Sequence, residues 1–179
     1  MLGNLMNIFI TSSDEFLSQQ FELISSGVSE RCLCGAFMLI LNKYIQESPY
    51  NQYYTDIEYN RNGSKLKTII DDSLIVIPIT CDIIVHSRGT IQLQDNLIAI
   101  EMKRSDHPPS EKAKDKARLK ALTKSDNEST LFSLNGRMFP KYVCGYVLGV
   151  YYEINTLLKV INIEYYVDGD IKQTYIRHY

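Results

Sequence analysis

The sequence predicts an α/β (α+β) protein in which a central mixed sheet of four to six strands is flanked by helices. Apolar residues recur at helical spacing in residues 13–46, β-branched apolar runs follow in residues 53–104, and a Lys-rich helical segment precedes further strand-like runs. The predicted order is helix, helix, three strands, helix, three strands. With 179 residues, of which 45% are hydrophobic, the chain is long enough to form a single domain spanning residues 1–179.

Two helices are predicted in the N-terminal quarter. The first covers residues 13–27, with Ser13 as its cap, an apolar stripe through its centre and Gly27 at its end. The second and longer helix runs from about Ser29 to Gln46, and Pro49 prevents its continuation.

Three strands are expected next, in "YYTDIEYNR" (residues 53–61), "LIVIPITCDIIVHSRG" (residues 74–89) and "NLIAIEMKR" (residues 96–104). Ser110 then caps a basic helix that ends near Lys124, in which Ala113, Ala117 and Ala121 share one stripe. Residues 125–141 lack a clear period and are interpreted as a loop that could contact a partner. A central strand in "YVCGYVLGVYY" (residues 142–152) and a hairpin at Asp168-Gly169 complete the chain.

Charge and cysteine content narrow the class of protein. The formal net charge is -2 and the pI is about 5.9, which argues against bulk attraction to nucleic acid, yet residues 103–124 carry a strong excess of Lys and Arg. No basic leader precedes the first apolar run, and no apolar run is long enough for a bilayer span. We therefore expect a cytoplasmic protein without membrane partners, whose four cysteines are free thiols: Cys32, Cys34, Cys81 and Cys144.

Charged residues interrupt two of the apolar strands. Because side chains alternate along a strand, Asp82 and His86 share a face of their strand, and Glu101 and Lys103 share a face of theirs. If the two strands pair as a hairpin, Asp82, Glu101 and Lys103 converge at one point. An ionised group in a sheet requires a partner or a metal, so this convergence is either a functional site or a buried salt-bridge cluster.

Two carboxylates held close together repel each other, and a hard divalent cation with oxygen ligands relieves that repulsion. Mg²⁺ or Mn²⁺ needs only one or two protein carboxylates and can take phosphate oxygens as further ligands. A neighbouring lysine can orient a water or offset charge that develops on a phosphate. The pattern of Asp82, Glu101 and Lys103 therefore indicates metal-assisted phosphodiester hydrolysis.

Asp82 followed by Glu101-Met102-Lys103 at the end of an apolar strand resembles the PD-(D/E)xK (restriction endonuclease-like) nuclease superfamily, whose core is helix, three strands, helix, strand. The resemblance covers residues 29–152 as the core, with residues 153–179 as an added C-terminal β-hairpin. It implies that Asp82, Glu101, the Met102 carbonyl and Glu30 are metal ligands, and that Lys103 is catalytic with Asp82 and Glu101. The chain departs from the pattern at Cys81, where many members have proline.

The motifs "EYNR", "DIIVHSRG" and "NLIAIEMKR" also resemble those of a bacterial group within this superfamily. That resemblance implies a shared environment for six residues: Glu58, Tyr59, Asn60, Arg61, His86 and Arg88. For three of them other roles stay open. Glu58 could join the metal site or pair with Arg61 or Arg88, His86 could be a hydrogen-bonded structural group, and Arg88 could hold a loop or a phosphate.

We expect a metal-dependent nuclease whose partner is nucleic acid, with DNA as the substrate, and Lys116, Lys120, Arg88, His86 and Glu58 as candidate contacts. The alternative is a non-catalytic nucleic-acid-binding or regulatory module that keeps the fold. A role in bacterial or phage-related defence, with activity that needs a homodimer or a companion subunit, is a further hypothesis.

Overall fold

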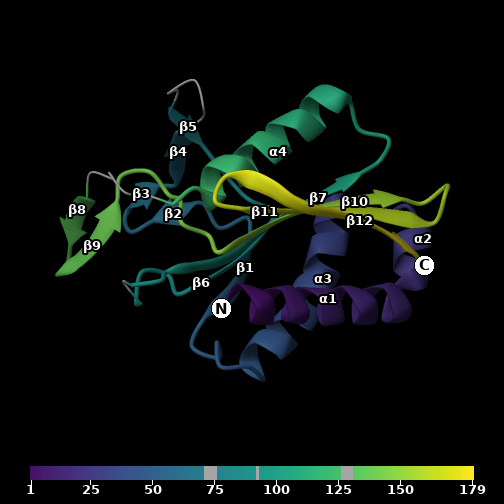
Figure 1. Cartoon of the computed structure of the whole chain (residues 1–179), viewed down its shortest axis with the longest axis horizontal. Helices are drawn as coiled ribbons and strands as arrows, with labels where there is room; N and C mark the ends of the chain where they lie inside the picture. The colour runs from purple at the N-terminus through teal and green to yellow at the C-terminus, as the bar shows by residue number, and fades with distance from the viewer. Residues whose placement is uncertain (71–75, 92, 126–130) are drawn as a thin grey trace.

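Figure 1 shows the computed structural model, which describes residues 1–70, 76–91, 93–125 and 131–179. A six-stranded sheet lies between helix α4 on one face and helices α1 to α3 on the other. The strand order is β1-β6-β7-β10-β11-β12. The pairings are antiparallel except between β7 and β10, which run parallel. The predicted mixed sheet flanked by helices is confirmed.

The helices are α1 (Leu2–Gln19), α2 (Phe21–Ser25), α3 (Glu30–Gln46) and α4 (Pro109–Thr123). The second predicted helix is confirmed, and the Ser29 hydroxyl accepts a hydrogen bond from the Cys32 N–H as its cap. The first prediction was wrong in its start and in its continuity, because α1 begins eleven residues before Ser13 and ends at Gln19, and the separate helix α2 follows from Phe21. Ser13 is instead buried within α1, where its hydroxyl lies 2.9 Å from the hydroxyl of Tyr152.

The central strands are β1 (Tyr54–Ile57), β6 (Ile83–His86), β7 (Asn96–Arg104), β10 (Leu148–Asn155), β11 (Val160–Val167) and β12 (Asp170–His178). Helix α4 forms the crossover between parallel β7 and β10. The predicted bounds of β7 match the structure, and the C-terminal hairpin turns at Asp168 and Gly169, whose φ angles of 52° and 81° suit a tight hairpin turn. On the central sheet the predicted succession of three strands, a helix and three strands is therefore present.

Three small hairpins stand apart from the central sheet, formed by β2 (Arg61–Asn62) with β3 (Lys65–Leu66), β4 (Thr68–Ile70) with β5 (Val76–Pro78), and β8 (Leu131–Leu134) with β9 (Arg137–Pro140). The single strand predicted for residues 74–89 is divided, because the chain leaves β5 after Pro78 and begins β6 at Ile83; residues 74 and 75 lie outside the described residues. The loop predicted for residues 125–141 contains the β8–β9 hairpin.

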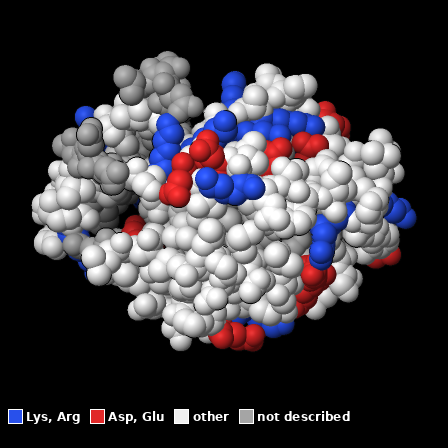
Figure 2. Space-filling model, viewed as in Figure 1, with Lys and Arg blue, Asp and Glu red and all other residues white. Residues whose placement is uncertain are grey.

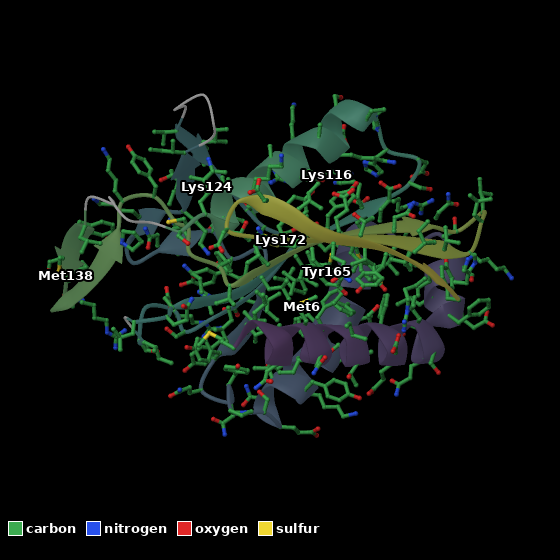
Figure 3. The ribbon with its side chains drawn as sticks, in the orientation of Figure 1. Met6, Lys116, Lys124, Met138, Tyr165 and Lys172 are labelled. Carbon is green, nitrogen blue, oxygen red and sulfur yellow. The ribbon has the colours of Figure 1, made fainter. Side chains whose placement is uncertain are left out.

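Each face of the sheet carries its own apolar core. In the larger core an edge-to-face contact of Phe9 with Tyr165 packs α1 against the sheet, and a similar contact of Phe16 with Phe37 packs α1 against α3. Figure 3 shows Tyr165 between the sheet and α1. The smaller core includes Leu119 and Leu122 of α4. Among the described residues, no helix is long and apolar enough to cross a bilayer.

Candidate active site

The C-terminal end of β7 carries two charged side chains on the sheet face that α4 covers. Glu101 is 1% exposed, and Lys103 follows two residues later on the same face. Both side chains are connected to α4: Glu101 accepts a hydrogen bond from Arg118 at 2.8 Å, and Lys103 Nζ lies 3.2 Å from Asp115 Oδ2. The predicted shared face of Glu101 and Lys103 is therefore present.

Asp115 and Arg118 were not among the residues predicted for the site. Asp115 is 4% exposed, and Arg118 forms an ion pair with it one turn along the helix. The buried stripe of α4 contains Asp115, Leu119 and Leu122, whereas Ala113 and Ala117 of the predicted alanine stripe are exposed. Asp115 lies four residues before Leu119 and seven before Leu122, so all three share one face of a helix. This spacing was the signal in the sequence that could have located Asp115.

Asp82 lies immediately before β6 and reaches across to β7. Its Oδ2 accepts a hydrogen bond from the Met102 N–H at 2.8 Å. Burial raises the pKa of Asp82, and the hydrogen bond from Met102 and the charge of Lys103 oppose that rise. Burial, followed by the charge of Asp82, raises the pKa of Glu101 well above its usual range despite the contact with Arg118. Asp82, Glu101 and Lys103 therefore influence one another electrostatically around the end of β7.

Lys103 joins the α4 side of the cluster to helix α3. Its Nζ lies 3.4 Å from Glu30 Oε2 as well as 3.2 Å from Asp115 Oδ2. Partial burial disfavours the ammonium, but Asp115 and Glu30 outweigh that effect and raise the pKa of Lys103. Lys103 is therefore a protonated side chain between two carboxylates.

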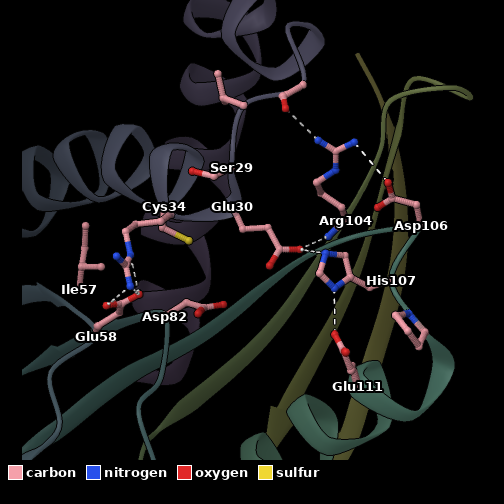
Figure 4. A pocket seen from close by; sticks show the side chains of 14 residues that line it. Ser29, Glu30, Cys34, Ile57, Glu58, Asp82, Arg104, Asp106, His107 and Glu111 are labelled. Atoms are coloured by element: carbon pink, nitrogen blue, oxygen red, sulfur yellow. Dashed lines mark hydrogen bonds and ion pairs between the residues drawn. The ribbon is translucent and has the colours of Figure 1, made fainter.

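Glu30 begins α3 and faces the end of β7, as Figure 4 shows. Its Oε1 accepts a hydrogen bond from the Arg104 N–H at 2.7 Å and lies 3.1 Å from His107 Nε2. The other ring nitrogen of His107 lies 3.0 Å from Glu111 Oε2. Glu30 thus lies beside Lys103 and the end of β7.

These residues surround an open cavity of about 730 Å³ between α3, the start of β6 and the start of α4. Its lining includes five carboxylates (Glu30, Glu58, Asp82, Asp106 and Glu111) but only two guanidinium groups, together with His107. A polyanion would be repelled by such a lining unless a cation neutralised part of it. Glu101 is not part of this lining.

Glu58 pairs with a residue that the sequence did not suggest. Both of its carboxylate oxygens accept hydrogen bonds from Arg31 of α3 at 2.9 Å, rather than from Arg61 or Arg88. Arg88 instead forms an ion pair with Asp56.

His86 contacts the same carboxylate as Arg88. It is 2% exposed, and its Nε2 lies 3.0 Å from Asp56 Oδ2, so it occupies the hydrogen-bonded structural position that was the alternative to nucleic-acid contact. Of the six residues grouped by the shorter motifs, Tyr59, Arg61, His86 and Arg88 line a second cavity.

Neighbouring carboxylates neutralise more of the positive charge of the basic helix α4 than its sequence suggested. Figure 2 shows blue Lys and Arg side chains over α4 with red carboxylates among them. Lys116 lies 2.6 Å from Glu164 and 4.6 Å from the ring centre of Tyr151, and Lys112 lies 3.2 Å from Glu153. Lys120, one turn beyond Lys116, is half-buried. Much of the excess positive charge therefore faces carboxylates of β10 and β11.

Within the described ranges, no group of three or more His, Cys, Asp or Glu side chains is arranged to hold a metal ion. Arg118 and the Met102 N–H occupy oxygens of Glu101 and Asp82. Cys32, Cys34 and Cys81 are free thiols. Burial raises the pKa of Cys81 well above its usual range, and the charges of Glu101 and Asp82 add to the effect.

No family model, curated protein or solved structure matches this chain. The resemblance to the PD-(D/E)xK superfamily therefore depends on the residue pattern and on the arrangement of elements around it.

Proposed function

We propose that this protein is a metal-dependent nuclease that hydrolyses phosphodiester bonds of nucleic acid, with DNA as the expected substrate. The observation that carries the proposal is the gathering of Asp82, Glu101, Lys103 and Glu30 around the end of β7, beside an acidic cavity. Strongly perturbed pKa values with identified charge partners, located at a cavity, are characteristic of functional sites.

The topology around these residues supports the proposal. Helix α3, strands β1, β6 and β7, helix α4 and strand β10 follow one another on the central sheet in the order of the PD-(D/E)xK core. Asp82 lies immediately before the second of these strands, and Glu101 and Lys103 lie near the end of the third, which supports the proposal.

The charges of the cluster fit a divalent cation. Four carboxylates, from Glu30, Asp82, Glu101 and Asp115, face the two permanent cations of Lys103 and Arg118. Oε2 of Glu101 is buried and has no hydrogen-bond partner within the described part of the chain. A buried carboxylate oxygen without a partner is costly, and hard oxygen donors are the ligands that Mg²⁺ and Mn²⁺ prefer.

In this proposal Asp82, Glu101 and the carbonyl of Met102 hold the metal, and Glu30 is the additional carboxylate. When bound, the metal lowers the pKa of a water and polarises the phosphate. Lys103 remains protonated between Glu30 and Asp115, where its positive charge can stabilise negative charge that develops on a phosphate. Arg118 positions the Glu101 carboxylate through its 2.8 Å hydrogen bond.

The test is cleavage of single- and double-stranded DNA and RNA in Mg²⁺, in Mn²⁺ and in chelator. Asp82→Asn and Lys103→Met should each lower the cleavage rate by at least about 100-fold, since each removes a charge from the reacting centre. Lys172→Met, at an exposed position of β12, is the matched control and should cleave as the wild type does. Cleavage that persists in both site variants, or that survives chelation, contradicts the proposal.

A second candidate function is supported by the ion pairs themselves. Arg118 and Lys103 already contact Glu101, Asp115 and Glu30, as in a stabilising charge network without chemistry. In that case the protein is a nucleic-acid-binding or regulatory module. Binding of nucleic acid without cleavage in any metal, with equal binding by Lys103→Met, favours this second function.

A further inference from the structure

A second cavity, of about 930 Å³, lies near the opposite end of β7. Asn96, the first residue of β7, lines this cavity, whereas Arg104, the last residue of β7, lines the first one. Eight residue steps along a strand separate the two by roughly 26 Å. The two linings share no residue, so the second cavity is independent of the proposed nuclease function.

Lys67 lines this cavity and is 3% exposed. Its backbone is fixed on both sides, because its N–H donates to the Asn60 carbonyl at 2.8 Å and its carbonyl accepts from the Ile79 N–H at 3.0 Å. Its ammonium donates to the Tyr146 hydroxyl at 3.1 Å and lies 5.4 Å from the ring centre of Tyr59. No carboxylate of the described chain forms an ion pair with it.

A buried ammonium without an ion pair is unusual, because desolvation disfavours the charged form, and here the more distant charges of Asp95 and Asp56 offset that effect only in part. Burial accordingly lowers the pKa of Lys67 to about 8. The neighbouring His86 does not compensate, since burial and the charge of Lys67 lower its pKa to about 4 and leave its ring neutral. A bound anion would supply the missing charge.

The rest of the lining is also cationic. Its described residues include four cationic side chains, Arg61, Lys67, Arg88 and Arg137, but a single carboxylate, that of Asp95. Asp95 is already engaged, because its Oδ1 accepts hydrogen bonds from the hydroxyl and N–H of Ser87 and from the N–H of Gly89.

Within the part of the chain that the structure describes, two of the three arginines in this lining form no ion pair. Asp56 neutralises Arg88, whereas Arg61 and Arg137 are exposed and form no ion pair within the described residues. The cavity therefore has a net positive charge.

Hydrogen bonds between segments far apart in the sequence hold the walls of the cavity in place. The Asn62 side chain donates to the Pro140 carbonyl at 2.6 Å, and the side chains of Asn96 and Gln94 donate to the carbonyls of Cys144 and Gly145 at 2.9 Å and 3.0 Å. Apolar side chains complete the wall next to the β8–β9 hairpin; these are Leu131, Leu134, Met138 and Val143. Figure 3 shows Met138 on this hairpin, apart from the central sheet.

We propose that this cavity binds a phosphorylated small molecule of nucleotide size, with its phosphate on the ammonium of Lys67 and within reach of Arg61 and Arg137. Ligand cavities commonly measure about 300–1,000 Å³, which agrees with this one. Lysine and arginine are the side chains that recognise phosphate, and the apolar wall suits the remainder of such a molecule.

The test is calorimetric titration of the whole protein with each of the four ribonucleoside 5′-monophosphates, with the matching nucleosides and with inorganic phosphate. At least one monophosphate should bind, and its nucleoside should bind at least tenfold more weakly. Lys67→Met and Arg61→Met should each weaken binding of that monophosphate at least tenfold. Lys172→Met and Asp82→Asn should leave the affinity unchanged.

Equal affinity of Lys67→Met and wild type for the monophosphate would overturn the proposal, and so would the absence of binding by every monophosphate and by inorganic phosphate. Arg61 is exposed, so Arg61→Met provides a second test that does not disturb the core. Unchanged binding by Asp82→Asn separates this site from the nuclease centre, whatever the outcome of the cleavage assay.

Discussion

The buried ammonium of Lys67 predicts that the protein becomes more stable when this charge is removed. The pKa of Lys67 falls from 10.5 to about 8 on folding. A shift of this size corresponds to about 3 kcal/mol, by which the buried charge destabilises the fold at neutral pH. Lys67→Met keeps the length of the side chain and removes the charge, but it leaves the Tyr146 hydroxyl without its donor, at a cost of about 1 kcal/mol. The net expectation is a gain of about 2 kcal/mol.

The lowered pKa of Lys67 also decides how the stability of the wild type changes with pH. Below pH 8 both the folded and the unfolded chain hold the Lys67 proton, so the penalty is fully present. Between the folded pKa of about 8 and the unfolded value of 10.5, the unfolded chain holds more protons, and the stability of the wild type rises with pH. The advantage of Lys67→Met over wild type should therefore shrink by about 2 kcal/mol between pH 7 and pH 9.5.

Urea unfolding followed by circular dichroism at the two pH values measures both quantities. Lys172→Met, which removes an exposed charge, is the control and should lie within about 0.5 kcal/mol of wild type at both pH values. A Lys67→Met protein that is less stable than wild type at pH 7, or an advantage that does not depend on pH, would refute the assignment of an uncompensated buried ammonium.

Three further predictions concern packing and charge, each measured by urea unfolding. Asp56→Ala should cost about 2–4 kcal/mol because it leaves His86 and Arg88 without their partner, and a cost below about 1 kcal/mol would show that the pairing is not stabilising. Gly149→Ala should cost about 1–3 kcal/mol, since the added Cβ would lie 2.8 Å from Thr123 Cγ2; a neutral effect would contradict this close packing of α4 on β10. Arg118→Met should lower the free energy of unfolding by about 3 kcal/mol in the absence of metal, because it leaves Glu101 without its ion-pair partner. Mg²⁺ should stabilise this variant more than wild type, and equal stabilisation of the two proteins would argue against a metal beside Glu101.

The parts of the fold that sequence reasoning located correctly have strong local signals. The bounds of β7 match because a run of apolar and β-branched residues is bounded by polar ones, and the start of α3 matches because Ser29 caps it. The first half of α1 was missed because Gly3, Asn4 and Asn7 weaken its helical propensity. Burial of Leu5 and Phe9 in the core, a tertiary contribution, stabilises this segment as a helix.

The candidate site was predictable in its strand residues but not in its helix residues. Side-chain alternation was enough to place Glu101 and Lys103 on one face. Their contacts with Asp115 and Arg118 depend on how α4 packs across the sheet, which local pattern does not specify. The same limit applies to Lys67, since neither its burial nor its contact with Tyr146, 79 residues later, has a local signal.

Direct binding of Mn²⁺, followed by electron paramagnetic resonance and calorimetry, tests the central claim that the carboxylates around the end of β7 hold a divalent ion. The wild type should bind Mn²⁺ in competition with Mg²⁺, and Asp82→Asn and Glu101→Gln should each weaken binding at least tenfold, while Asp170→Asn, at an exposed position of β12, should not. Equal Mn²⁺ affinity in all four proteins, or no binding by the wild type, would contradict the account.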